Sequence, residues 1–131
     1  MAQPGHYLPR HLDKALAQAI LSSPIVVLDG ARGTGKTTTA RRMCASSIML
    51  PRELPALKGD PEAYLRSLPT PVLLDEWQLA GPDLLWILKG IVDDDPAPGR
   101  FVLTGSVEPA AYGPTYPLTG RAVRLVLRPM T

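Results

Sequence analysis

A glycine-rich segment limits the folds open to this chain more than any other feature of its sequence. Residues 30–37 match the pattern G-x-x-x-x-G-K-[ST] in full. The glycines let the backbone curl until several N–H groups converge on one phosphate, and a helix that begins at Lys36 adds its positive N-terminal end. The predicted nucleotide-binding residues are Gly30, Ala31, Arg32, Gly33, Thr34, Gly35, Lys36, Thr37 and Thr38.

Four side chains of this segment have distinct expected contacts. The Lys36 ammonium can reach the β- and γ-phosphates, which is a catalytic as well as a binding role. The Thr37 hydroxyl can ligate magnesium, and Thr38 offers an N–H and a hydroxyl near the α-phosphate. Arg32 either contacts the nucleotide or extends into solvent.

Apolar runs that alternate with helical patterns predict an α/β fold. With 131 residues the chain is expected to form a single domain, 1–131, in which residues 1–22 are an N-terminal helix region. Alternating strands and helices indicate a three-layer sandwich with a mainly parallel five-stranded sheet. The expected strands are 24–28, 47–50, 71–74, 101–103 and 123–127, and the expected helices are 9–22, 36–46, 60–65 and 81–92.

The helical patterns also predict which side chains are buried. In the first helix the apolar residues include Leu16, Ile20 and Leu21, near helical spacing. Asp60 is expected to cap the short helix that follows it, with a proline at the first helical position. Trp77 and Trp86 are both interpreted as core residues, Trp86 within a helix.

Two acidic residues, Asp75 and Glu76, follow a buried apolar strand directly. In a parallel α/β sheet the carboxyl end of a strand opens towards the ligand crevice. Asp75 is therefore placed to hold magnesium, and Glu76 to polarise an attacking water. Alone, such a pair is as readily a polar turn; the complete phosphate loop upstream favours the catalytic interpretation.

Polar residues follow a second apolar strand, and an arginine precedes the last one. Thr104 and Ser106 are both candidates to place the water between the acidic pair and the γ-phosphate. Arg121 could stabilise transition-state charge in its own chain or in a neighbouring subunit, and a surface ion pair explains it equally well. With Arg124 and Arg128 it is interpreted as part of a solvated basic face.

Composition excludes several classes of protein. The net charge of +2 is too small to indicate a nucleic-acid partner, and the single cysteine, Cys44, excludes an internal disulfide and a multi-cysteine metal site. No apolar stretch of about 18 residues indicates a membrane span, and the N-terminus lacks the pattern of a signal peptide. We therefore expect a cytoplasmic protein.

The order of these motifs resembles the AAA-type ATP-binding domain of a large group of bacterial and archaeal ATPases. The resemblance covers nearly the whole chain, and its more specific pieces are Asp-Glu-x-Gln at 75–78, Thr-Gly-Ser at 104–106 and Gly-Arg at 120–121. It implies a P-loop NTPase fold of the additional-strand type, in which the strand before the acidic pair lies next but one to the first strand. It further implies ATP rather than GTP, with Thr104 as the sensor.

The same resemblance implies a longer protein. In that group the domain is usually followed by a C-terminal part, often with a nuclease-like domain of unknown function, so we expect the chain to be truncated at its C-terminus. The region 50–69 is short and lacks the acidic pair that the group usually has after its second strand. A missing C-terminal domain or a second copy of the chain is the expected partner besides the nucleotide.

The sequence therefore favours Mg-dependent ATP binding and hydrolysis that drive a conformational change in an attached or partner domain. A non-catalytic nucleotide-binding or scaffold module is the alternative. A small P-loop kinase is less favoured, because no arginine-rich lid or substrate-binding acid is evident. A GTPase is disfavoured because the guanine-binding Asn-Lys-x-Asp tetrapeptide is absent.

Overall fold

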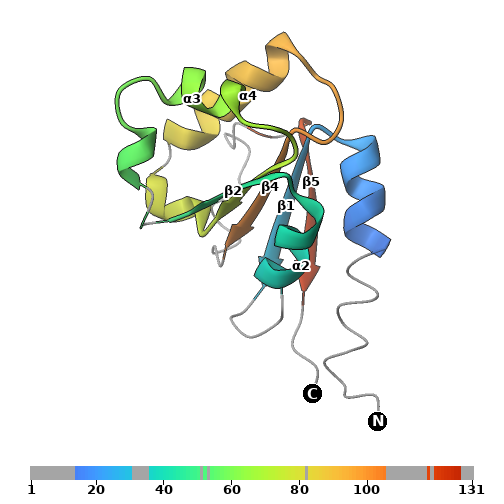
Figure 1. Cartoon of the computed structure of the whole chain (residues 1–131). Helices are drawn as coiled ribbons and strands as arrows, with labels where there is room; N and C mark the ends of the chain where they lie inside the picture. Colours follow the sequence, from blue (N-terminus) through green and yellow to red (C-terminus); the bar gives the residue numbers. More distant parts are fainter. Residues whose placement is uncertain are drawn as a thin grey trace.

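Five parallel strands form one sheet at the centre of the molecule (Figure 1). The computed structural model describes residues 14–30, 36–50, 52, 54–81, 83–105, 118 and 120–127. The strand order is β2-β3-β4-β1-β5, and all four neighbouring pairs are parallel. The strands are β1 (Ile25–Gly30), β2 (Ser46–Met49), β3 (Val72–Asp75), β4 (Phe101–Gly105) and β5 (Ala122–Leu127).

Helices cover both faces of this sheet, so the predicted three-layer sandwich is confirmed. The pair α3 and α4 lies on one face, whereas α2 and the helix over residues 14–22 lie on the other (Figure 1). Because β4 separates β1 from β3, the additional-strand order is confirmed as well. The remaining elements are α2 (Lys36–Met43), η1 (Leu54–Leu57), α3 (Pro61–Ser67), η2 (Trp77–Ala80) and α4 (Asp83–Asp94).

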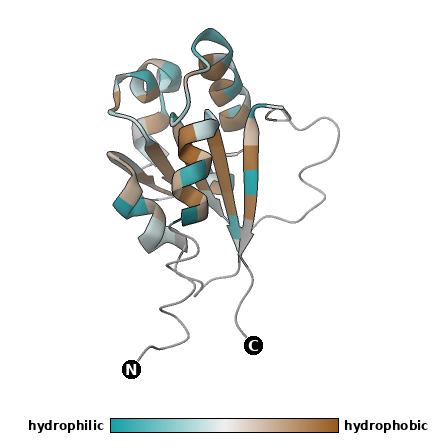
Figure 2. Ribbon diagram, turned by 90° about the vertical axis from the view of Figure 1, so that its right-hand side faces the viewer, coloured by the Kyte–Doolittle hydropathy of each residue, from teal (hydrophilic) through white to brown (hydrophobic). Residues whose placement is uncertain are grey.

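Strand β1 contributes to two hydrophobic cores because side chains alternate across a sheet. Ile25 and Val27 pack in the core beneath α3 and α4, and Val26 and Leu28 pack in the core beneath α2 and the N-terminal helix. All four side chains are at most 1% exposed. The central strands are accordingly apolar along most of their length (Figure 2). A strand that is buried on both faces reads as a continuous apolar run, which is the pattern found here.

Two of the residues predicted to lie in the core are exposed instead. Leu21 is 77% exposed, because it lies five residues beyond the buried Leu16 and hence about 140° around the helix. Trp86 is 56% exposed, because it lies about 160° around α4 from the buried Leu84 and Leu88. Trp77, by contrast, is buried as predicted.

The predicted start of α3 is confirmed. The carboxylate of Asp60 accepts a hydrogen bond from the backbone N–H of Ala63 at 3.0 Å, and Pro61 occupies the first helical position. Proline fits there because the first N–H of a helix has no intrahelical partner.

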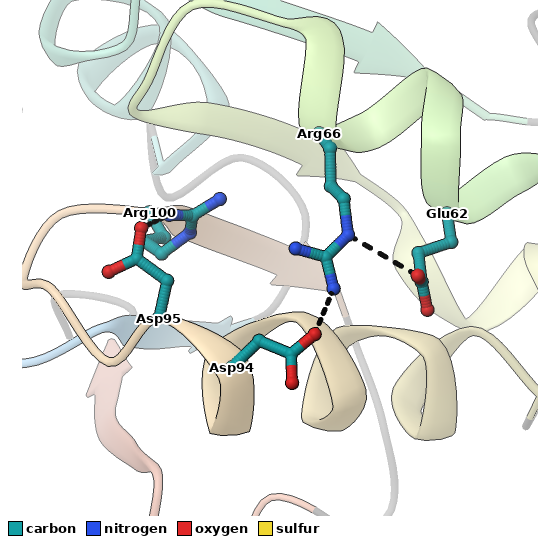
Figure 3. A network of polar contacts seen from close by, with 5 residues as sticks. All are labelled: Glu62, Arg66, Asp94, Asp95 and Arg100. Carbon is teal, nitrogen blue, oxygen red and sulfur yellow. Dashed lines mark hydrogen bonds and ion pairs between the residues drawn. The ribbon is translucent and has the colours of Figure 1, made fainter.

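Three consecutive aspartates lie at the C-terminal end of α4, where the helix dipole disfavours negative charge. An arginine from a different element binds each of them, and Figure 3 shows two of the three pairs. These contacts connect the end of α4 to α3 and to the starts of β4 and β5. The N···O distances are 2.6 Å for Arg121 and Asp93, 2.7 Å for Arg66 and Asp94, and 2.6 Å for Arg100 and Asp95.

Candidate functional site

Chemically distinctive residues collect at one edge of the sheet. Because all strands run in the same direction, their carboxyl ends meet at one edge (Figure 1). Gly30, Asp75 and Gly105 end β1, β3 and β4 there, and α2 begins nearby at Lys36. The edge therefore unites the two ends of the glycine-rich segment with the acidic pair and the polar end of β4.

A buried carboxylate joins three of the predicted residues, Thr37, Asp75 and Thr104, which we call the Asp75 cluster. Asp75 is 9% exposed, and its Oδ1 accepts a hydrogen bond from Thr37 Oγ1 at 2.8 Å and another from Thr104 Oγ1 at 2.5 Å. Asp75 and Thr104 are register partners on neighbouring strands. The sequence separations of 38 and 29 residues show that only the fold brings these groups together.

The composition of the Asp75 cluster suits a hard divalent cation. Carboxylate and hydroxyl oxygens are the ligand types that magnesium prefers, and Thr37 and Asp75 present both within hydrogen-bond distance of each other. Thr104 is fully buried, so its hydroxyl has no solvent to bond instead. Its hydrogen bond to Asp75 satisfies a polar group that burial would otherwise penalise.

Glu76 adopts a backbone conformation that L-residues rarely use. Its φ of 55° and ψ of 49° lie in the left-handed region, and no other non-glycine residue in the described ranges has a positive φ. This conformation costs about 1–2 kcal/mol. Strain of this kind is found where function fixes the backbone, so it marks Glu76 as a functional candidate. The side chain of Gln78 contacts the Glu76 carboxylate, because Gln78 Nε2 donates a hydrogen bond to Glu76 Oε2 at 2.6 Å.

Other predicted residues are placed less completely. Gly30 ends β1, Lys36 begins α2, and Thr38 lies exposed on α2 one residue after Thr37. The side chain of Lys36 lies outside the described part of the chain. So do Ala31, Arg32, Gly33, Thr34 and Gly35 of the loop, the alternative sensor Ser106, and Arg128.

Arg121 lies at the amino-terminal end of the strands, opposite to the end that carries the Asp75 cluster. It precedes β5, and the register pairs its neighbour Ala122 with Ile25, at the start of β1. Gly30 lies five residues beyond Ile25 on β1, which is about 16 Å along the strand. The Arg121 guanidinium binds Asp93, with Nε to Oδ1 at 2.6 Å, and thereby forms the surface ion pair that the sequence left open. The structure does not bring Arg121 to the Asp75 cluster of the same chain.

The sequence did not predict one ion pair that lies near the site. Asp29 precedes Gly30, is 4% exposed, and accepts a hydrogen bond from Arg124 Nε at 2.6 Å. Arg124 is therefore not part of a purely solvated face, because it neutralises a buried carboxylate at the base of the loop. The signal for this pair was an acid at the end of an apolar strand, a position similar to that of Asp75.

Four further features lie outside the proposed site. Within the described ranges, no group of three or more histidine, cysteine, aspartate or glutamate residues is placed to hold a metal. No helix in those ranges is long and apolar enough to cross a membrane. Burial raises the pKa of the Cys44 thiol from 9.0 to about 12. A cavity of about 370 Å³ is lined by other residues than those of the Asp75 cluster. The end of η1 and the start of α3 line one side of it, and the end of η2 and the first half of α4 line the other.

Comparisons with known proteins identify the family of the chain and its fold. The sequence model of the family described as "AAA domain" matches residues 22–131, more than half of the chain. Two curated relatives, an uncharacterized protein of Mycobacterium bovis and one of Mycobacterium tuberculosis, are each 34% identical over 104 residues. Those residues make up 75% of this chain and 23% of each relative, so the chain spans about a quarter of their length.

A solved structure shares the fold. The P-loop NTPase domain of the sigma-54 transport activator from E. coli superimposes with a TM-score of 0.60 at 17% sequence identity. The superposition covers 99% of this chain and 100% of that domain. The chain therefore has a P-loop NTPase fold.

Proposed function

This chain belongs to the family of AAA domains, and on that premise we propose that it binds ATP with magnesium and hydrolyses the bond between the β- and γ-phosphates. The observation that carries the proposal is the Asp75 cluster, in which a buried carboxylate contacts both the first helical turn after the loop and the end of β4. The cluster brings together a carboxylate and hydroxyl oxygens, the ligand types that a magnesium site uses, at the start of the helix that follows the loop.

The loop and the Asp75 cluster divide the binding roles. Backbone N–H groups from Gly30 to Thr38, together with the Lys36 ammonium, bind the phosphates. The Thr37 hydroxyl and the Asp75 carboxylate would hold magnesium, and the ion would offset negative charge on the bound phosphates. Thr104 holds Asp75 through its hydrogen bond. Its position at the end of β4 suits the proposed sensor role, in which it would help to place the attacking water near the γ-phosphate.

Glu76 is the proposed general base. The water oxygen attacks the γ-phosphorus, the water proton passes to the Glu76 carboxylate, and the bond to the β–γ bridging oxygen breaks so that ADP leaves with that electron pair. The left-handed backbone of Glu76 supports this role, because strain of that kind needs a reason other than stability.

Hydrolysis would serve a conformational change in an attached or partner domain. The relatives are about four times as long as the region they share with this chain, which gives such a domain a place in the whole protein. The proposed site in one chain does not contain Arg121. That arginine could act only on the nucleotide of a neighbouring subunit, and it would have to leave Asp93 to do so.

The test is phosphate release by the purified chain with ATP and magnesium. Wild type is expected to release phosphate, Lys36→Ala to lose both binding and release, and Glu76→Gln to keep binding while its release falls about a hundredfold or more. Binding without release by the wild type would refute hydrolysis and favour the non-catalytic nucleotide-binding module. Equal release by Glu76→Gln and the wild type would refute the role of Glu76.

A further inference from the structure

Gln78 is the described side chain that bonds the proposed general base. Its amide Nε2 donates to Glu76 Oε2 at 2.6 Å. Glu76 is only half-buried, so solvent competes for its carboxylate, and its side chain has several rotatable bonds. A hydrogen bond from a half-buried amide two residues away restricts that freedom. It occupies Oε2 and leaves Oε1 to accept the proton of water.

The end of β4 holds the Gln78 amide in place. A Cβ atom added at Gly105 would overlap Gln78 Oε1 and would lie 3.1 Å from Trp77 Nε1. The φ of Gly105 is not positive, so the backbone there would accept another residue. The absence of a side chain therefore serves the close approach of η2 to β4. Gly105 directly follows Thr104, so the amide lies beside the strand that contacts Asp75.

Stability does not explain an amide at this position. Gln78 Oε1 and Trp77 Nε1 are buried without a hydrogen-bond partner within the described part of the chain. A buried polar atom without a partner disfavours folding, and an apolar side chain of similar size would avoid that penalty. Among the described residues, the hydrogen bond that this amide makes goes to Glu76, which connects it to the proposed general base.

We propose that Gln78 is a positioning residue that orients the Glu76 carboxylate for proton transfer, and that the packing of Gln78 on Gly105 fixes this orientation. The proposal rests on the proposed function, in which Glu76 activates the attacking water. In this proposal Gln78 acts through Glu76 and makes no contact with the nucleotide. Its removal should therefore slow turnover and leave nucleotide binding intact.

The test compares steady-state hydrolysis and thermal unfolding of the chain with two substitutions. Gln78→Met keeps the length of the side chain and removes both polar atoms, whereas Gln78→Asn keeps an amide that is one methylene too short to reach Glu76. Both are expected to lower kcat about tenfold to a hundredfold with KM unchanged within about twofold. The unfolding temperature of Gln78→Met should not fall, because the unpaired Oε1 is removed. Gln18→Met, at an exposed position of the N-terminal helix, is the matched control and should behave as wild type.

The outcomes separate this proposal from the function on which it rests. A folded Gln78→Met or Gln78→Asn variant with wild-type kcat would overturn the positioning role, as would a loss confined to KM. If the wild type hydrolyses ATP and Glu76→Gln does not, such a result leaves the proposed function standing. If the wild type shows no hydrolysis, or Glu76→Gln hydrolyses as fast as wild type, the proposed function fails and the positioning role fails with it.

Discussion

Replacement of Thr104 by valine tests the Asp75 cluster without any nucleotide. Thr104 is fully buried, and because valine has nearly the shape of threonine the substitution leaves no sizeable cavity. It removes one hydroxyl, and with it the hydrogen bond to Asp75 Oδ1 at 2.5 Å. The carboxylate then keeps its bond from Thr37 and loses the other.

The size of the effect follows from the charge and the burial of the acceptor. A hydrogen bond to a charged group contributes about 1.5–3 kcal/mol, and Asp75 is 9% exposed, so water replaces the lost donor poorly. The free energy of unfolding should fall by that amount. For a domain of this size the fall corresponds to roughly 5–12 °C in the unfolding temperature.

The assay is urea and thermal unfolding by circular dichroism, with EDTA and without nucleotide. Thr70→Val, at an exposed position, is the control and should stay within about 0.5 kcal/mol of wild type. Thr104→Ser keeps the hydroxyl and should retain more stability than Thr104→Val. A Thr104→Val variant that is as stable as Thr70→Val would show that this contact carries no net free energy.

Three further predictions concern residues outside the Asp75 cluster. Hydrogen bonds from Arg121 and then Lys89 lower the pKa of Asp93 from 3.8 to about 2, so the unfolded chain binds more protons in this interval. The ionised Asp93 carboxylate stabilises the folded chain fully above pH 3.8, and this stabilisation is lost as the pH falls to about 2. Asp93→Asn should therefore flatten the pH dependence of the urea unfolding midpoint between pH 3.8 and about 2. An unchanged pH dependence in this variant would contradict the ion pairs of Asp93. The Cys44 thiol, with its pKa raised to about 12 by burial, should react with a disulfide reagent at pH 8 roughly a thousandfold more slowly in the native than in the unfolded chain, and equal rates would contradict its burial. Arg121→Ala should leave hydrolysis per chain unchanged at the lowest measurable protein concentration, because Arg121 lies at the far edge of the sheet; a loss there would refute that placement.

The sequence predicted those parts of the fold and site that follow from strand direction. Two apolar runs end in Asp75 and Thr104, and a parallel sheet brings such ends to one edge, so their meeting required only the fold class. The glycine-rich segment supplied that class, because its chemistry requires a strand before it and a helix after it. The direct hydrogen bonds from Thr37 and Thr104 to one carboxylate oxygen needed coordinates.

Arg121 shows where the order of motifs is an incomplete guide. A residue that precedes a parallel strand lies at the edge opposite to residues that follow one, so its distance from Asp75 was implicit in the strand prediction. Its ion pair with Asp93 depends on how α4 packs on the sheet, which no local pattern specifies. Leu21 and Trp86 are apolar but exposed, because their angular positions on the helices face away from the core and residue type alone does not indicate this.

Gln78 shows a different limit. Its hydrogen bond to Glu76 depends on the left-handed backbone of a glutamate, a conformation that residue type does not indicate. Its packing on Gly105 joins two segments whose proximity only the sheet order establishes. Tertiary packing determines short-range geometry of this kind, so the spacing of residues in the sequence does not predict it.

The most direct test of the central claim is a calorimetric titration of the chain with ATP and magnesium, with Lys36→Ala titrated in parallel. Binding of one ATP per chain by the wild type, weakened when EDTA replaces magnesium and lost in Lys36→Ala, is the predicted result. Folded wild-type chain that takes up no ATP, or binding that persists unchanged in Lys36→Ala, would contradict the assignment of the nucleotide to the loop at residues 30–37.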